Sequence, residues 1–188
     1  MLKYRSLQKI ADEAMKNNVS IGAYVLKDQA MQMETAEEKI LEVMDRQLTV
    51  MEQAAVNGSA PGIRSMSGLT GGDAFRMLEY GKKNNTISGD FCSKAMATAI
   101  AVAEYNAAMG RIVASPTAGS CGILPGVLIP MMQEKKIDRQ AAVIALVCAG
   151  GIGMVIANKA SLSGAAGGCQ AECGSASAMA AAALVEMA

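Results

Sequence analysis

Histidine is absent from this sequence of 188 residues, and aromatic residues make up only 3% of it. Without histidine, the chain itself cannot supply an imidazole general base or an imidazole metal ligand. Any acid–base chemistry must fall to Lys, Asp, Glu, Tyr, Cys, a metal-bound group or another chain. With so few aromatic rings, Ala, Met, Leu, Val and Ile must fill the core, which indicates closely packed helices.

An excess of charge of either sign is absent as well. The sequence has 17 basic and 17 acidic residues and contains no block of basic residues. This balance argues against a nucleic-acid-binding surface. With 52% hydrophobic and 18% charged residues, the chain can build a sizeable core and does not have a disordered composition. The length favours a single domain covering residues 1–188.

No signal peptide is recognisable, because Met1–Arg5 leads directly into an amphipathic pattern. We therefore expect a cytoplasmic protein. In a reducing compartment, the five cysteines serve as free thiols or metal ligands rather than as disulfides.

Apolar residues recur at helical spacing through most of the chain, which predicts an all-α fold. The expected helices cover residues 3–17, 21–33, about 36–56, 73–80, 90–109, 123–132, 139–158 and 174–188, with a short strand at 112–114. The uncharged run 141–157 is at the lower limit for a membrane span. Its glycines and alanines favour the alternative, the most buried helix of a protein outside the membrane.

Three glycine-rich turns, 58–72, 115–122 and 161–174, each lead into an expected helix start. Free N–H groups at such a start suit an anion, for example a carboxylate or a phosphate. The turns are not P-loops, because the Gly-x4-Gly-Lys-[Ser/Thr] pattern is missing. The alternative is three ordinary surface turns. Glu104 and Asn106 lie in an apolar helix, which predicts hydrogen-bond partners for both.

Two cysteines lie in the third turn. Cys169 and Cys173 are four residues apart, so both thiols share one face if the segment is helical. A thiol pair beside bare backbone suggests a soft metal or an iron–sulfur cluster. The alternative is a turn in which the cysteines act as small hydrophobic residues. Cys121 lies in the second turn.

Three stretches, Ser67–Asp73, Asn106–Gly119 and Ser161–Glu172, resemble motifs of one family in the family's order. This family is the α chain of the iron–sulfur-dependent L-serine dehydratase, the bacterial L-serine ammonia-lyase that does not use pyridoxal phosphate. The resemblance covers nearly the whole chain. It implies a mostly helical domain with a [4Fe–4S] cluster, which converts L-serine to pyruvate and ammonia in amino-acid degradation and gluconeogenesis. It also implies a separate β chain and an oligomeric enzyme.

The resemblance assigns Cys169, in the Gly-Cys-Gln motif, as a cluster ligand. It places two further ligands in a later Cys-Asp-Pro-Val-Ala-Gly…Pro-Cys segment, which this sequence does not contain. The rival ligand set from the residues alone is Cys121, Cys169 and Cys173. The implied mechanism uses three thiolates and leaves one iron open as a Lewis acid for the serine hydroxyl. Because the sequence ends within an expected helix, we expect a truncated chain that is inactive alone.

The resemblance further implies that the turns bind serine, with its carboxylate held by backbone N–H groups and hydroxyls. The expected substrate-binding residues are Ser67, Thr70, Gly71, Asn106, Thr117, Gly119 and Ser163. We expect the segments 67–72, 115–119 and 161–168 to meet in one cleft. The sequence does not identify the catalytic base. The rival function is a non-catalytic helical assembly subunit with packing cysteines, which would not need so many polar residues beside apolar helices.

Overall fold

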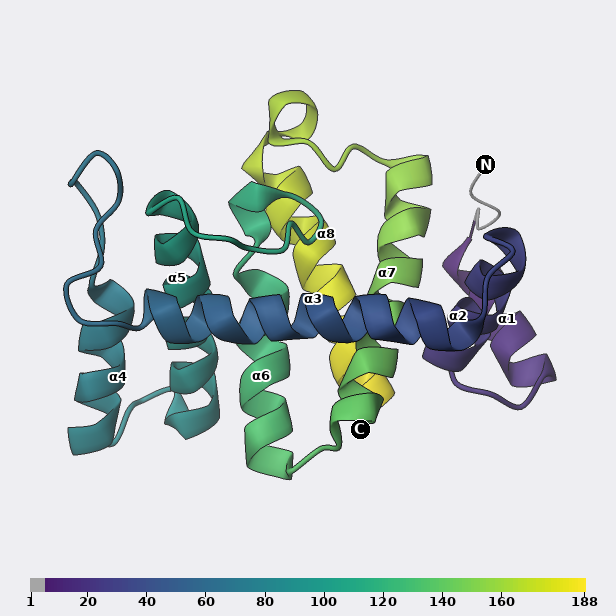
Figure 1. Cartoon of the computed structure of the whole chain (residues 1–188), viewed down its shortest axis with the longest axis horizontal. Coiled ribbons are helices and arrows are strands. Elements are labelled where there is room, and N and C mark those ends of the chain that lie inside the picture. Colours follow the sequence, from purple (N-terminus) through teal and green to yellow (C-terminus); the bar gives the residue numbers. More distant parts are fainter. Residues whose placement is uncertain (1–5) are drawn as a thin grey trace. The chain divides into compact units, whose positions relative to one another are not determined.

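The computed structural model describes residues 6–188, and within them it contains helices and no strand. The elements are α1 (Leu7–Lys16), α2 (Ile21–Gln32), α3 (Glu37–Gly58), α4 (Asp73–Lys83), α5 (Gly89–Ala107), the short 3-10 turn η1 (Ala118–Ser120), α6 (Ile123–Lys135), α7 (Arg139–Lys159) and α8 (Gly164–Met187) (Figure 1). The all-α prediction is confirmed. The strand at 112–114 was wrong, since these residues have no neighbouring strand with which to form a ladder. Residues 3–5 of the first expected helix lie outside the described residues.

The chain divides into two compact units, which we describe separately. Unit 1 comprises residues 1–48 and 138–188 and contains α1, α2, α7 and α8. Unit 2 comprises residues 49–137 and contains α4, α5, η1 and α6. Helix α3 begins in unit 1 and ends in unit 2. One domain over 1–188 therefore stays a prediction.

Helix α7 forms the core of unit 1, where it packs against α2 and α8. More of its residues are buried than in any other described helix, as predicted for 141–157. A Cβ atom on Gly151 would lie 2.6 Å from Val25 Cγ2, so the helices approach closely only because this position is glycine. Asp138 caps the start of α7, where its side chain accepts a hydrogen bond from the Gln140 N–H.

Within the described residues, α7 alone is long and apolar enough to cross a membrane by length and composition. In its most apolar window, 61% of the residues are buried inside the protein. Such burial is what the central helix of a water-soluble bundle also shows, so the composition of α7 by itself is weak evidence for a membrane span.

Helix α5 is the centre of unit 2, in contact with α4, α6 and η1. Its alanine face allows backbone-to-backbone approach. A Cβ atom on Gly126 of α6 would lie 2.7 Å from the Ala99 Cβ atom, and one on Gly58 would collide with the Ala101 carbonyl group. The scarcity of large rings in the sequence follows from this packing, because only small side chains fit between helices so close together.

The third glycine-rich turn is shorter than predicted. Helix α8 begins at Gly164, ten residues before the expected start, because Ser163 caps it by accepting a hydrogen bond from the Ala165 N–H. The helix is interrupted at Gly168, whose φ of 74° and ψ of 175° are not helical. Residues 161–174 therefore form a short loop, one helical turn, a kink at Gly168 and then the continuing helix, on which Cys169 and Cys173 lie.

We predict that Gly58→Ala lowers the free energy of unfolding by about 1–3 kcal/mol, because the added methyl group must displace the backbone of α5 at Ala101. Gly81→Ala is the matched control in α4. Its added methyl group meets no atom within 4 Å, and alanine improves helix propensity by up to about 1 kcal/mol. Urea unfolding of both variants gives the comparison, and equal stabilities would contradict the proposed close approach.

Candidate functional site

The last turn of α5 holds the two glycine-rich turns of unit 2. The first turn is tied to it by the Met66 N–H, which donates to the Ala107 carbonyl group at 3.1 Å. The second is tied by Asn106, whose Nδ2 donates to the Ala118 carbonyl group at 3.1 Å. Segments 40 or more residues apart in sequence thus converge on one helix end, which we call the α5 site, defined by residues 104–107 and these two turns.

Glu104 anchors the first turn most firmly. Glu104 is only 8% exposed, and its carboxylate accepts hydrogen bonds from two consecutive amides at the start of α4. The Asp73 N–H lies 2.8 Å from Oε1, and the Ala74 N–H lies 3.3 Å from Oε2. The prediction that Glu104 needs a partner is confirmed. Two of the N–H groups expected to bind a substrate anion are therefore already engaged by the protein.

The first turn is a compact loop with internal hydrogen bonds. The Ser65 N–H donates to the Thr70 carbonyl group at 2.9 Å, and the Thr70 N–H donates to Ser65 Oγ at 3.2 Å. Ser67 Oγ lies 3.1 Å from Ser65 Oγ. Gly71 is buried and has a φ of 133°, which favours glycine. The predicted residues Ser67 and Thr70 are both exposed at the surface of this loop.

Arg64 reinforces the loop and was missed by the sequence reasoning. Its guanidinium group donates to the carbonyl groups of Gly71 and Ile63, and thereby closes the base of the loop. The same guanidinium group lies against Gly72, where a Cβ atom would be 3.1 Å from it. A single arginine before a serine-rich turn carries no sequence signal that distinguishes this role from a solvated charge.

The second turn presents a small group of hydroxyls. Thr117 Oγ1 lies 3.1 Å from Ser120 Oγ, which is buried and itself lies 3.5 Å from the Ser115 carbonyl oxygen. Ser115 is 5% exposed, and its hydroxyl group has no hydrogen-bond partner among the described residues. Gly119 is exposed. Among the predicted residues, Asn106, Thr117 and Gly119 therefore belong to one local structure.

The third turn belongs to unit 1 and presents the thiol pair. Cys169 and Cys173 are both exposed and lie on α8 one helical turn apart, so the predicted common face is present. Cys169 Sγ lies 3.7 Å from Gln170 Oε1. Ser163 is exposed at the start of α8, where its hydroxyl group serves as the cap. The meeting of all three turns in one cleft stays a prediction.

The described residues do not contain a complete metal site. No group of three or more Cys, Asp or Glu side chains among them is placed to hold a metal ion. Cys169 and Cys173 supply two exposed thiols, which suit part of an iron–sulfur ligand set. Cys121 suits it poorly, because it is 1% exposed and burial raises the pKa of its thiol.

Cys148 is a structural cysteine in the core of unit 1. Burial, with the nearby Glu186 carboxylate as a second cause, raises the pKa of its thiol to about 12. Its Sγ lies 3.9 Å from the carbonyl oxygen of Ala182 on α8. Cys92, on α5, differs from Cys148 in that it is exposed.

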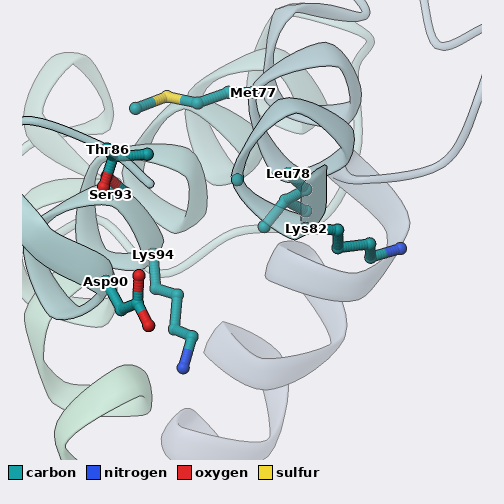
Figure 2. Close-up of a pocket in the computed structure, with 8 residues that line it drawn as sticks. Met77, Leu78, Lys82, Thr86, Asp90, Ser93 and Lys94 are labelled. Atoms are coloured by element: carbon teal, nitrogen blue, oxygen red, sulfur yellow. The ribbon is translucent and has the colours of Figure 1, made fainter. Parts of the chain in front are cut away.

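A separate pocket of about 220 Å³ lies between α4 and the first half of α5. Figure 2 shows Thr86 and Ser93 together on one wall, while Lys82 points away from them. Ser93 Oγ donates to Thr86 Oγ1 at 2.7 Å, so the hydroxyls on this wall are used within the protein. None of the predicted site residues lines this pocket.

Comparison with known proteins gives one consistent result. Residues 16–188 match the family model described as serine dehydratase alpha chain. The chain is 43% identical over 185 residues to the probable L-serine dehydratase, alpha chain, of Bacillus subtilis (strain 168), covering 98% of this chain and 61% of the relative. It is 42% identical over 180 residues to the L-serine dehydratase, alpha chain, of Peptoniphilus asaccharolyticus, covering 96% and 62%. The chain thus spans about three-fifths of the length of these relatives.

A further relative matches over a shorter region. The L-serine dehydratase of Streptomyces coelicolor is 50% identical over 90 residues, which cover 47% of this chain and 20% of the relative.

The different environments of the cysteines predict their reactivity. Near neutral pH, a thiol reagent should modify Cys92, Cys169 and Cys173 within minutes and leave Cys121 and Cys148 unmodified, because the buried thiols are inaccessible and their raised pKa values keep them protonated. Peptide mass spectrometry identifies the labelled residues, and all five should react in denaturant. Labelling of Cys148 in the native chain at the rate of Cys169 would contradict the burial of α7.

Proposed function

Because this chain belongs to the serine dehydratase alpha chain family, we propose that it forms the α-chain part of an L-serine ammonia-lyase. In this reaction, L-serine loses its α proton and its hydroxyl group as water. The resulting enamine takes up a proton to become an imine, and water then releases ammonia and leaves pyruvate. The observation that carries the proposal is the family match over residues 16–188. The polar residues gathered at the α5 site support it.

We propose that the α5 site binds serine through hydroxyl groups. Thr70 lies on the loop anchored by Glu104, and Thr117 lies on the loop anchored by Asn106. Since the two anchors are two residues apart on α5, the threonines extend from one short stretch of rigid helix. Such pre-positioned donors hold a substrate without further ordering of the protein, which keeps the cost of binding low.

The proposed cofactor is a [4Fe–4S] cluster, with Cys169 as one ligand and Cys173 as a less favoured second. The exposure of both thiols supports this proposal. The chain alone does not enclose a cluster, so a cysteine ligand must be accessible at the surface. Cys169 and Cys173 would supply part of the cluster's ligand set. When bound, the group would supply Lewis acidity, which suits a reaction with a poor leaving group.

We further propose a separate β chain as partner, an oligomeric enzyme and a cytoplasmic location. The first follows from the name alpha chain, which both long relatives carry. The location is consistent with five free thiols. The rival function, a non-catalytic assembly subunit with packing thiols, is not favoured, because such a subunit does not need the polar residues that gather at the α5 site.

We predict that Cys169→Ser abolishes the iron–sulfur absorbance and the serine-dependent formation of pyruvate in the enzyme assembled with its β chain. Cys148→Ala is the control, and it should retain both, because Cys148 is buried in the core of unit 1. Iron content and absorbance after anaerobic reconstitution give the readout. Loss of the cluster in Cys148→Ala together with its retention in Cys169→Ser would reverse the assignment.

We predict that Thr70→Ala and Thr117→Ala each raise the Michaelis constant for serine while the cluster absorbance stays unchanged. The loss of one hydrogen bond that is buried in the complex costs about 1–3 kcal/mol, which corresponds to about 5- to 150-fold. Thr86→Ala is the matched control, since Thr86 lines the separate pocket and is not part of the α5 site. Steady-state kinetics with serine measure the effect, and unchanged constants in both variants would exclude the α5 site.

A further inference from the structure

We propose that Glu104 is a positioning residue of the α5 site, and that its carboxylate acts as the cap of α4 and thereby holds the Ser67 and Thr70 loop in its binding geometry. This inference rests on the proposed function. It assigns Glu104 no contact with the reacting atoms.

The first argument is the geometry of the cap. Glu104 offers one oxygen to each of two consecutive amides, at 2.8 Å and 3.3 Å, and the side chain is buried. The start of a helix carries a partial positive charge that stabilises an anion. The two amides and the helix start therefore stabilise the negative charge of the buried carboxylate. Among the described residues, no cation lies within hydrogen-bonding distance of it.

The second argument is that α4 has no local means of capping. The residue before α4 is Gly72, which has a φ of 84° and no side chain with which to bond the first amides. Serine or aspartate, the usual caps, are strained at this φ. The tight turn at Gly71 and Gly72 thus excludes a local cap, and the required acceptor comes from Glu104, 31 residues away from Asp73.

The third argument is that hydrogen bonds attach the Ser67 and Thr70 loop to α5 on both sides of these two residues. Glu104 holds the end of the loop at Asp73, and the Ala107 carbonyl group holds its middle at Met66. The exposed residues Ser67 and Thr70 lie between these two attachment points. Without Glu104, one of the two hydrogen-bonded attachments of the loop to α5 is lost, and the Asp73 and Ala74 amides lack an acceptor. The loop is therefore expected to move away from the helix.

The test uses Glu104→Ala in the assembled enzyme and small carboxylates as a replacement for the missing side chain. We expect the Michaelis constant for serine to rise by about tenfold or more, as for a lost charged hydrogen bond, while the turnover number and the cluster absorbance change little. Added formate should occupy the vacated helix start and lower the Michaelis constant again. Formate should not affect the wild type or Thr117→Ala.

Two variants serve as comparisons. Glu104→Gln keeps the volume and loses the charge, so it should show a smaller rise and no response to formate, because the site is filled. If Glu104→Ala does not fold, the Gln variant still tests the charge. Glu79→Ala removes a carboxylate of α4 that pairs with Lys82 and lies outside the α5 site, and it should behave like the wild type.

Hydrogen exchange separates this inference from the proposed function. In Glu104→Ala, amides of residues 63–76 should exchange faster, and formate should restore their protection, whether or not the enzyme acts on serine. A wild type inactive on serine would overturn the proposed function and leave this readout intact. Unchanged exchange and an unchanged Michaelis constant would overturn the positioning role. A loss confined to the turnover number would also overturn it, because that pattern indicates a catalytic group.

Discussion

The close approach of α5 to its neighbours is the constraint on which the rest of unit 2 depends. At Ala99 and Ala101, backbone or Cβ atoms of α5 face glycines, and a side chain at Gly58 or Gly126 would force the helices apart. Contacts this close tolerate almost no displacement, so the packing fixes the position of α5 relative to the segments that contain Gly58 and Gly126. Its last turn therefore provides a rigid support, and the two loops of the α5 site take their positions from it.

The same physical solution recurs in both units, since each uses a distant carboxylate to satisfy a helix start. In unit 2, Glu104 accepts from Asp73 and Ala74. In unit 1, Glu186, near the end of α8, accepts from the Gly22 N–H at 3.1 Å, at the start of α2. In each case the bond also joins two elements far apart in sequence. Removing such a carboxylate therefore affects both a helix end and the tertiary packing.

Sequence periodicity predicted most of the fold, because helices with one apolar face or an entirely apolar surface differ clearly from strands. Periodicity did not predict the start of α8 correctly, because a single hydrogen bond determines where that helix begins. The start of α8 depends on the cap at Ser163, and the sequence alone did not distinguish this serine from the other serines nearby. For the candidate site, the polar character of Glu104 signalled a buried partner, but the identity of that partner depends on tertiary contacts. Likewise, spacing alone could not show that Cys121 is buried and Cys169 exposed.

The occupancy of the helix starts also changes how serine binding is to be understood. Sequence reasoning placed the substrate carboxylate on N–H groups at helix N-termini. At α4, the Asp73 and Ala74 amides already have Glu104 as an acceptor, and at α8 the Ala165 amide has Ser163. A second carboxylate at α4 would have to displace Glu104 or lie beside its charge, and both are unfavourable in a buried setting. The proposed binding therefore relies on the hydroxyl-bearing loops, and the helix starts hold these loops in place.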